Sequence, residues 1–163
     1  MSLGRIPMTK EGAQALKQEL KKLTEVDRAN IAQAISDARE LGDLKENAEY
    51  HAAKEQQGLI EARISFIQDQ MKNSQVIDIS NIPNSGKVIF GTTVSLLNID
   101  NDKRMTVRFV GELEADLKAG KMAVTAPIAR ACIGKSIGDV VEVETPSGVV
   151  NYEIESVEHT PAS

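Results

Sequence analysis

The sequence predicts an α+β protein of two domains: an N-terminal antiparallel α-helical coiled-coil hairpin, followed by an antiparallel sheet with one short helix. Residues 9–40 and 48–74 form long proline-free segments with helical periodicity, and only a short turn separates them. Beyond a turn-rich linker at 81–86, β-branched and alternating segments dominate. We therefore place the hairpin domain at residues 1–78 and the sheet domain at residues 79–163.

Composition limits the possible partners. The chain has 163 residues, 41% hydrophobic and 26% charged, which is typical of a folded protein. A formal net charge of −5 argues against general attraction to nucleic acid, so any such contact must be local or arranged by a partner. No apolar run approaches the roughly 20 residues of a membrane span, and no signal peptide opens the chain. The single cysteine, Cys132, excludes an internal disulfide. From these features we expect a cytoplasmic location and no membrane partner.

The first helix begins after Pro7, with Thr9 as the expected N-cap. Its apolar residues recur with spacings of three, four and three, which is the seam of a coiled coil. They are Ala13, Leu16, Leu20 and Leu23. A polar stretch at 24–30 follows, and we expect the seam to shift phase there.

The second helix supplies the matching half of the seam. Its apolar residues repeat at four, three and four: Ile60, Ile64, Ile67 and Met71. In an antiparallel hairpin, opposed positions have a constant sum of residue numbers. That sum is 87 for the pairs Leu16 with Met71, Leu20 with Ile67, and Leu23 with Ile64. Near the turn the seam is mostly alanine, which predicts a slim end of the hairpin that is suited to a narrow channel. The alternative is that the hairpin serves only as a spacer or a dimerisation arm.

The sheet domain contains short segments with strand character. Residues 127–133 read as its one helix, with Pro127 at the first position and Gly134 ending it. The expected strands are residues 75–79, 87–90, 93–98, 105–110, 123–124, 140–145 and 149–157.

The turn at 42–46 is acidic and contains the main chemical candidates, Asp43 and Glu46. Their spacing of three, across a tight turn, can direct both carboxylates outward. Mg²⁺ prefers oxygen ligands and commonly takes one or two carboxylates plus oxygens from elsewhere. The pair therefore resembles half of a metal site that a partner completes. Alternatively, Asp43 caps the second helix while Glu46 and Glu49 favour its dipole.

Other candidates carry weaker signals. His51 and His159 have no partners at metal-ligand spacing, and the chain has no glycine-rich phosphate loop or nucleophile elbow. Arg39, Lys45 and Lys54 lie near the acidic turn. They could contact a phosphate backbone, or they could pair with neighbouring carboxylates on the helix surface.

Residues 38–57, which include the run GDLKENAEY, resemble the hairpin tip of the GreA/GreB family of bacterial transcript cleavage factors. The resemblance continues through several later segments and covers nearly the whole chain. These segments are residues 76–78, 86–91, 127–130, 133–135 and 145–148.

The resemblance implies a function on RNA polymerase. It implies an FKBP-like C-terminal domain that docks at the rim of the polymerase secondary channel, and a hairpin that carries its tip to the active centre. Asp43 and Glu46 fall on the family's acidic positions and would share a second Mg²⁺ with the polymerase, against the 3′ end of backtracked nascent RNA. The factor would stimulate cleavage there and would have no activity, and no stably bound metal, by itself.

The resemblance also favours the GreA type, because the hairpin has few cations for RNA; Arg39 and Lys54 are the best candidates. It places polymerase docking at Thr125 and Pro127, although Thr125 and Ala126 stand where many relatives have Asn or Asp and Ser. A regulator that occupies the channel without cleavage is the alternative function. A peptidyl-prolyl isomerase is disfavoured by the scarcity of aromatic residues.

Overall fold

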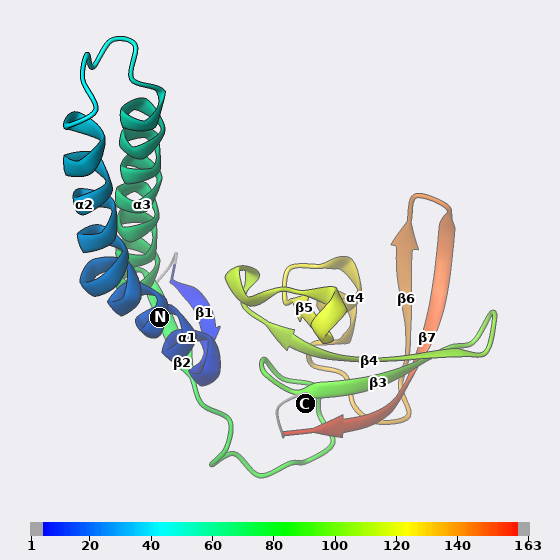
Figure 1. The fold of residues 1–163 in the computed structure, drawn as a ribbon. Helices are drawn as coiled ribbons and strands as arrows, with labels where there is room; N and C mark the ends of the chain where they lie inside the picture. The colour runs from blue at the N-terminus through cyan, green and yellow to red at the C-terminus, as the bar shows by residue number, and fades with distance from the viewer. Residues whose placement is uncertain (1–4, 160–163) are drawn as a thin grey trace. The chain divides into compact units, whose positions relative to one another are not determined.

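A computed structural model describes residues 5–159 (Figure 1). It divides into two compact units, residues 13–74 and residues 5–12 with 75–159. The terminal residues 1–4 and 160–163 of the predicted domains lie outside the described residues. The predicted fold class, a helical hairpin followed by a sheet with one short helix, is confirmed.

The hairpin arms lie antiparallel, with α2 (Arg28–Arg39) beside α3 (Ala48–Lys72) in Figure 1. The first arm begins as α1 (Lys10–Lys22) and passes through a π-helical turn, η1 (Leu23–Asp27), before α2. Buried residues form the seam: Leu23, Ile60, Ile64 and Ile67, with Leu16, Leu20, Ile31 and Met71 packed against them. These include all six residues that the sequence paired across the hairpin.

The π-helical turn accounts for the phase shift expected at residues 24–30. The Arg28 N–H donates to the Leu23 C=O, five residues back instead of four. One extra residue in the turn rotates all that follows relative to the seam. The apolar face can then continue through Ile31 and Ile35, which would otherwise drift away from α3.

Two bidentate ion pairs join the arms on either side of this turn. Arg28 donates to both carboxylate oxygens of Glu61 at 2.7 Å, and Arg63 donates to those of Glu19 at 2.7 and 2.8 Å. The hydrogen bonds from the arginines hold the pKa of Glu19 and of Glu61 below the ordinary value. The pairs join the two arms in the same antiparallel orientation as the apolar seam.

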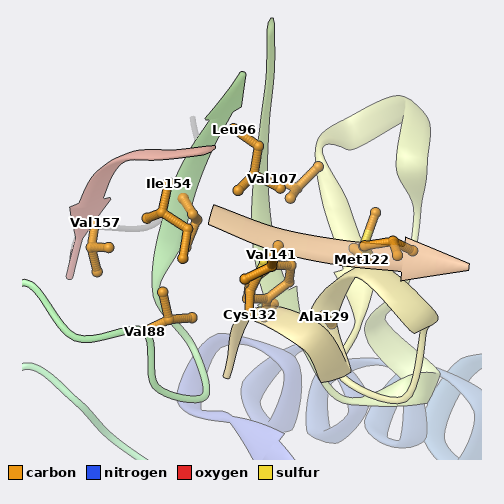
Figure 2. Packing of buried hydrophobic residues seen from close by; sticks show 12 residues of the cluster. Val88, Leu96, Val107, Met122, Ala129, Cys132, Val141, Ile154 and Val157 are labelled. Carbon is orange, nitrogen blue, oxygen red and sulfur yellow. The ribbon is translucent and has the colours of Figure 1, made fainter. Parts of the chain in front are cut away.

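The second unit is built on a five-stranded sheet in the order β5-β4-β3-β7-β6. All neighbouring strands are antiparallel except β4 and β5, which are parallel. The strands are β3 (Thr93–Asn98), β4 (Lys103–Val110), β5 (Lys121–Ala123), β6 (Val140–Thr145) and β7 (Gly148–Glu158). The helix α4 (Pro127–Cys132) covers one face, and its Ala129 and Cys132 lie in the core drawn in Figure 2.

Some short elements differ from the sequence prediction. The strand expected at 87–90 is wrong: only Lys87 pairs, in an isolated bridge to Ser136. The backbone of Val88 bonds instead to the loop after α4, where its N–H donates to Lys135 C=O and its C=O accepts from Gly134 N–H. Two further strands differ from the prediction. The strand β1 (Ile6–Thr9), which pairs with β2 (Ser74–Ile77), was not predicted. The strand β5 lies at Lys121–Ala123 instead of the predicted 123–124.

Residues 5–12 are held to the sheet by buried polar contacts. The side chain of Arg108 is 7% exposed, and it donates to Glu11 Oε1 and to the Gly91 C=O, both at 2.9 Å. Glu114 Oε2 accepts the N–H groups of Thr9 and Gly111, each at 3.0 Å. The predicted N-cap is confirmed, because Thr9 Oγ1 accepts the Gly12 N–H.

Replacing Arg108 should therefore destabilise the second unit. Arg108→Met keeps the aliphatic stem but leaves a buried carbonyl without its donor, and we expect a loss of about 2 kcal/mol in the free energy of unfolding. Denaturant unfolding followed by circular dichroism measures it. The matched control is Arg104→Met, whose exposed pair with Glu155 should be dispensable. Equal unfolding midpoints for the two variants would contradict this assignment.

Cys132 should be unreactive in the folded protein. It is fully buried, and burial raises the pKa of its thiol to about 11. We expect no reaction with a thiol-specific reagent at neutral pH until denaturant is added, when one thiol per chain should react. Rapid labelling of the folded protein would show that α4 opens readily.

Candidate functional site

The candidate site is the tip loop, residues 40–47, between α2 and α3. Gly42 lies in this loop with a φ of 126°, a conformation that favours glycine. The buried residues nearest the loop include the small Ala38 and Ala53, as the alanine-rich sequence there suggests. Two small side chains let the arms approach closely beneath the loop.

Asn47 connects the two arms at the base of the tip loop. It is the N-cap of α3, and its Oδ1 accepts the Tyr50 N–H at 3.0 Å. Its Nδ2 donates to the Ala38 C=O at the end of α2, at 2.5 Å. The alternative that Asp43 caps α3 is therefore wrong, because Asn47 holds that position.

Both predicted acidic residues are exposed, and they share one concave surface. Asp43, Glu46 and Glu49 line an open hollow of about 410 Å³ together with Leu41, Asn47 and Ala48. One oxygen of Asp43, Oδ1, accepts the Lys45 N–H at 3.0 Å, which fixes the carboxylate within its own turn. Within residues 5–159, Asp43 Oδ2 and both oxygens of Glu46 have no hydrogen-bond or ion-pair partner.

The hollow offers part of a metal coordination sphere. Across residues 5–159, no group of three or more His, Cys, Asp or Glu side chains is arranged to hold a metal ion. The available oxygens of Asp43 and Glu46 are of the kind that Mg²⁺ prefers, but they fill fewer than its six positions. The residues present could hold part of the coordination sphere of a Mg²⁺ ion, which stays a prediction.

The cations near the tip are not engaged in ion pairs in the part of the chain described. Arg39 lies over the ring of Tyr50, with its Cζ 5.8 Å from the ring centroid. Lys54 Nζ donates to Gln57 Oε1 at 3.1 Å. The alternative of a salt-bridged surface therefore does not hold for these two residues, whose contact with RNA stays a prediction.

His51 contacts the tip loop itself, which the sequence reasoning missed. Its Nε2 lies 3.3 Å from the Lys45 C=O, and its ring meets that of Tyr50 edge to face, with centroids 5.6 Å apart. Asn47 was not among the residues predicted from the sequence, although Asn directly before a helical segment is a capping signal. The bond from Asn47 to α2 has no signal in the local sequence.

The predicted docking residues lie in the second unit, one in the turn after β5 and the other at the start of α4. Thr125 and Pro127 are both exposed, and Pro127 is the first residue of α4. The turn is tied to the sheet, because the Val124 N–H donates to the Val110 C=O at 2.7 Å. Nothing in this geometry tests docking, which stays a prediction. No helix among the described residues is long and apolar enough to span a membrane.

Two family models match the chain. "Transcription elongation factor, N-terminal" matches residues 6–76, and "Transcription elongation factor, GreA/GreB, C-term" matches residues 83–159. The chain belongs to the GreA/GreB family of transcription elongation factors. GreA of Pseudomonas aeruginosa is 58% identical over 157 residues, which cover 96% of this chain and 99% of that protein. GreA of Haemophilus influenzae is 53% identical, with 95% and 98% covered.

Solved structures also resemble this GreA/GreB member. GreA factor homolog 1 of Thermus thermophilus is 25% identical, with a TM-score of 0.42, and the match covers 94% of this chain and 99% of that one. The family membership expected from the run at 38–57 is confirmed by the family models and the GreA relatives.

Proposed function

We propose that this chain is a transcription elongation factor that acts on bacterial RNA polymerase and stimulates Mg²⁺-dependent cleavage of the 3′ end of backtracked nascent RNA. Arrested elongation complexes would thereby resume synthesis. The family membership supports the elongation-factor role. The observation that carries the cleavage role is the pair of exposed carboxylates, Asp43 and Glu46, in one hollow at the hairpin tip.

The proposed chemistry depends on which carboxylate oxygens of Asp43 and Glu46 are available to a metal ion. When bound, the shared Mg²⁺ supplies a Lewis acid for hydrolysis of a phosphodiester. Asp43 would offer Oδ2, which has no partner within residues 5–159, whereas its Oδ1 already accepts the Lys45 N–H. Glu46 would offer a carboxylate without a hydrogen-bond or ion-pair partner within residues 5–159. Both groups would help to hold the ion and to orient water, and polymerase residues would complete the site.

The hairpin suits delivery of this pair through the secondary channel. The 25 residues of α3 span about 37 Å at 1.5 Å per residue. Buried alanines keep the arms close near the tip. Arg39 and Lys54, both exposed and outside ion pairs within residues 5–159, would meet the RNA backbone next to the carboxylates. Thr125 and Pro127 would contact the rim of the channel.

On this proposal the protein is not an enzyme alone, and it holds no metal stably before docking. Two carboxylates in water bind Mg²⁺ weakly, since the ion keeps most of its hydration shell. Because its partner is bacterial RNA polymerase, the protein would work in the cytoplasm.

The test adds the purified protein to a backtracked elongation complex and follows the length of the RNA. Asp43→Asn keeps the acceptor for the Lys45 N–H, and Glu46→Gln keeps the size of the side chain, so both variants should fold and bind polymerase normally. Each removes a charged ligand, and we expect cleavage to slow on the order of a hundredfold. Glu55→Gln is the matched control, because it neutralises an exposed α3 carboxylate outside the hollow.

Two outcomes would contradict the proposal in different ways. Cleavage at the parent rate by both tip variants would remove the metal role from Asp43 and Glu46. Binding of the parent protein without any shortening of the RNA would instead favour the non-cleaving channel regulator.

A further inference from the structure

The Asn47 side chain makes two hydrogen bonds that only an amide can make together. Its oxygen accepts from the Tyr50 N–H in α3, and its nitrogen donates to the Ala38 C=O in α2. Capping alone does not require asparagine, because serine and aspartate cap helices equally well. Neither of those side chains offers an acceptor and a donor at the two ends of one planar group. The identity of residue 47 therefore matters for the bond to α2.

That bond closes the base of the loop that presents the carboxylates. The loop leaves α2 after Arg39, the residue next to Ala38, and its last residue is Asn47, so the Asn47–Ala38 contact holds its two ends together. Asp43 and Glu46 lie between those ends. Without this contact the two ends of the loop are no longer held together by a side chain, and the carboxylates between them lose that constraint.

A second contact fixes the middle of the loop. A carbonyl oxygen only accepts hydrogen bonds, so His51 Nε2 is the donor to the Lys45 C=O. The N–H of Lys45 in turn donates to Asp43 Oδ1. The orientation of Asp43 is thus connected to α3 through Lys45 and His51, while Asn47 fixes the end of the loop beside Glu46.

We propose that Asn47 is a positioning residue for the cleavage-stimulating tip: through its bond to Ala38 it fixes the placement of Asp43 and Glu46, the residues that would hold the shared Mg²⁺, in one hollow. This inference rests on the proposed function. Residues that orient metal ligands typically change metal affinity or activity by 10–100-fold when replaced. A displacement of about 1 Å in reacting groups can have an effect of similar size.

The discriminating variant is Asn47→Ser, which retains the cap on the Tyr50 N–H but is too short to reach α2 as well. We expect unchanged helix content and unchanged affinity for polymerase. In the free protein, ¹⁵N relaxation should show lower order parameters for residues 41–46, while the Tyr50 amide stays protected from hydrogen exchange. In the backtracked complex, the Mg²⁺ concentration for half-maximal cleavage should rise about tenfold.

Two further variants serve as controls. Asn30→Ser changes an exposed asparagine elsewhere on the hairpin and should match the parent in every assay. Asn47→Asp also keeps the cap but sets an oxygen against the Ala38 C=O, and it adds a negative charge to the lining of the hollow. Added charge alone would lower the Mg²⁺ requirement, whereas a displaced loop raises it, so a raised requirement supports positioning.

The outcomes separate this inference from the function on which it rests. If the parent cleaves and Glu46→Gln does not, but Asn47→Ser keeps the parent's Mg²⁺ dependence, only the positioning role is overturned. Order parameters for residues 41–46 that equal those of the parent overturn it as well. A parent protein that never shortens the RNA overturns the proposed function, and the positioning role with it.

Discussion

Burial of the apolar seam between the two arms is the constraint on which the hairpin depends. Ile64 and Ile67 are almost completely buried, and full burial of such a side chain contributes roughly 1.5–3 kcal/mol. In an uninterrupted α-helix, the apolar residues after Leu23 would rotate away from α3. The π-helical turn at Leu23–Asp27 corrects this rotation and keeps the seam continuous. Since the seam fixes which residues face each other, it also fixes which residues occupy the loop at the end.

The tip loop is ordered by a different kind of interaction from the seam. Its residues 41–46 are all exposed, and its order comes from a few polar contacts instead of packing. Those contacts use one oxygen of Asp43 and leave Glu46 unoccupied by any partner within residues 5–159. A surface held in this way can present negative charge to a partner without first reorganising.

Much of the hairpin could be predicted from the sequence, because its helices and their apolar faces are determined by residues close together in the chain. Helical spacing of Leu and Ile gave the arms and their register, and the polar stretch at 24–30 indicated the phase shift. The segment at 87–90 contains the β-branched residues Val88 and Ile89, which are typical of a strand. Its backbone hydrogen bonds are nevertheless made with residues 134–135, far along the chain. The bond from Asn47 to Ala38 likewise depends on the folded hairpin, so the capping signal alone could not reveal it.

We propose that the tip supplies ligands for a cation that neither partner holds tightly by itself. Electron paramagnetic resonance with Mn²⁺ in place of Mg²⁺ measures this directly, by counting ions bound to the polymerase, to the factor and to their complex. We expect one additional bound ion in the complex, which disappears when Asp43→Asn and Glu46→Gln are combined. The same number of ions with the parent and with the double variant would contradict it.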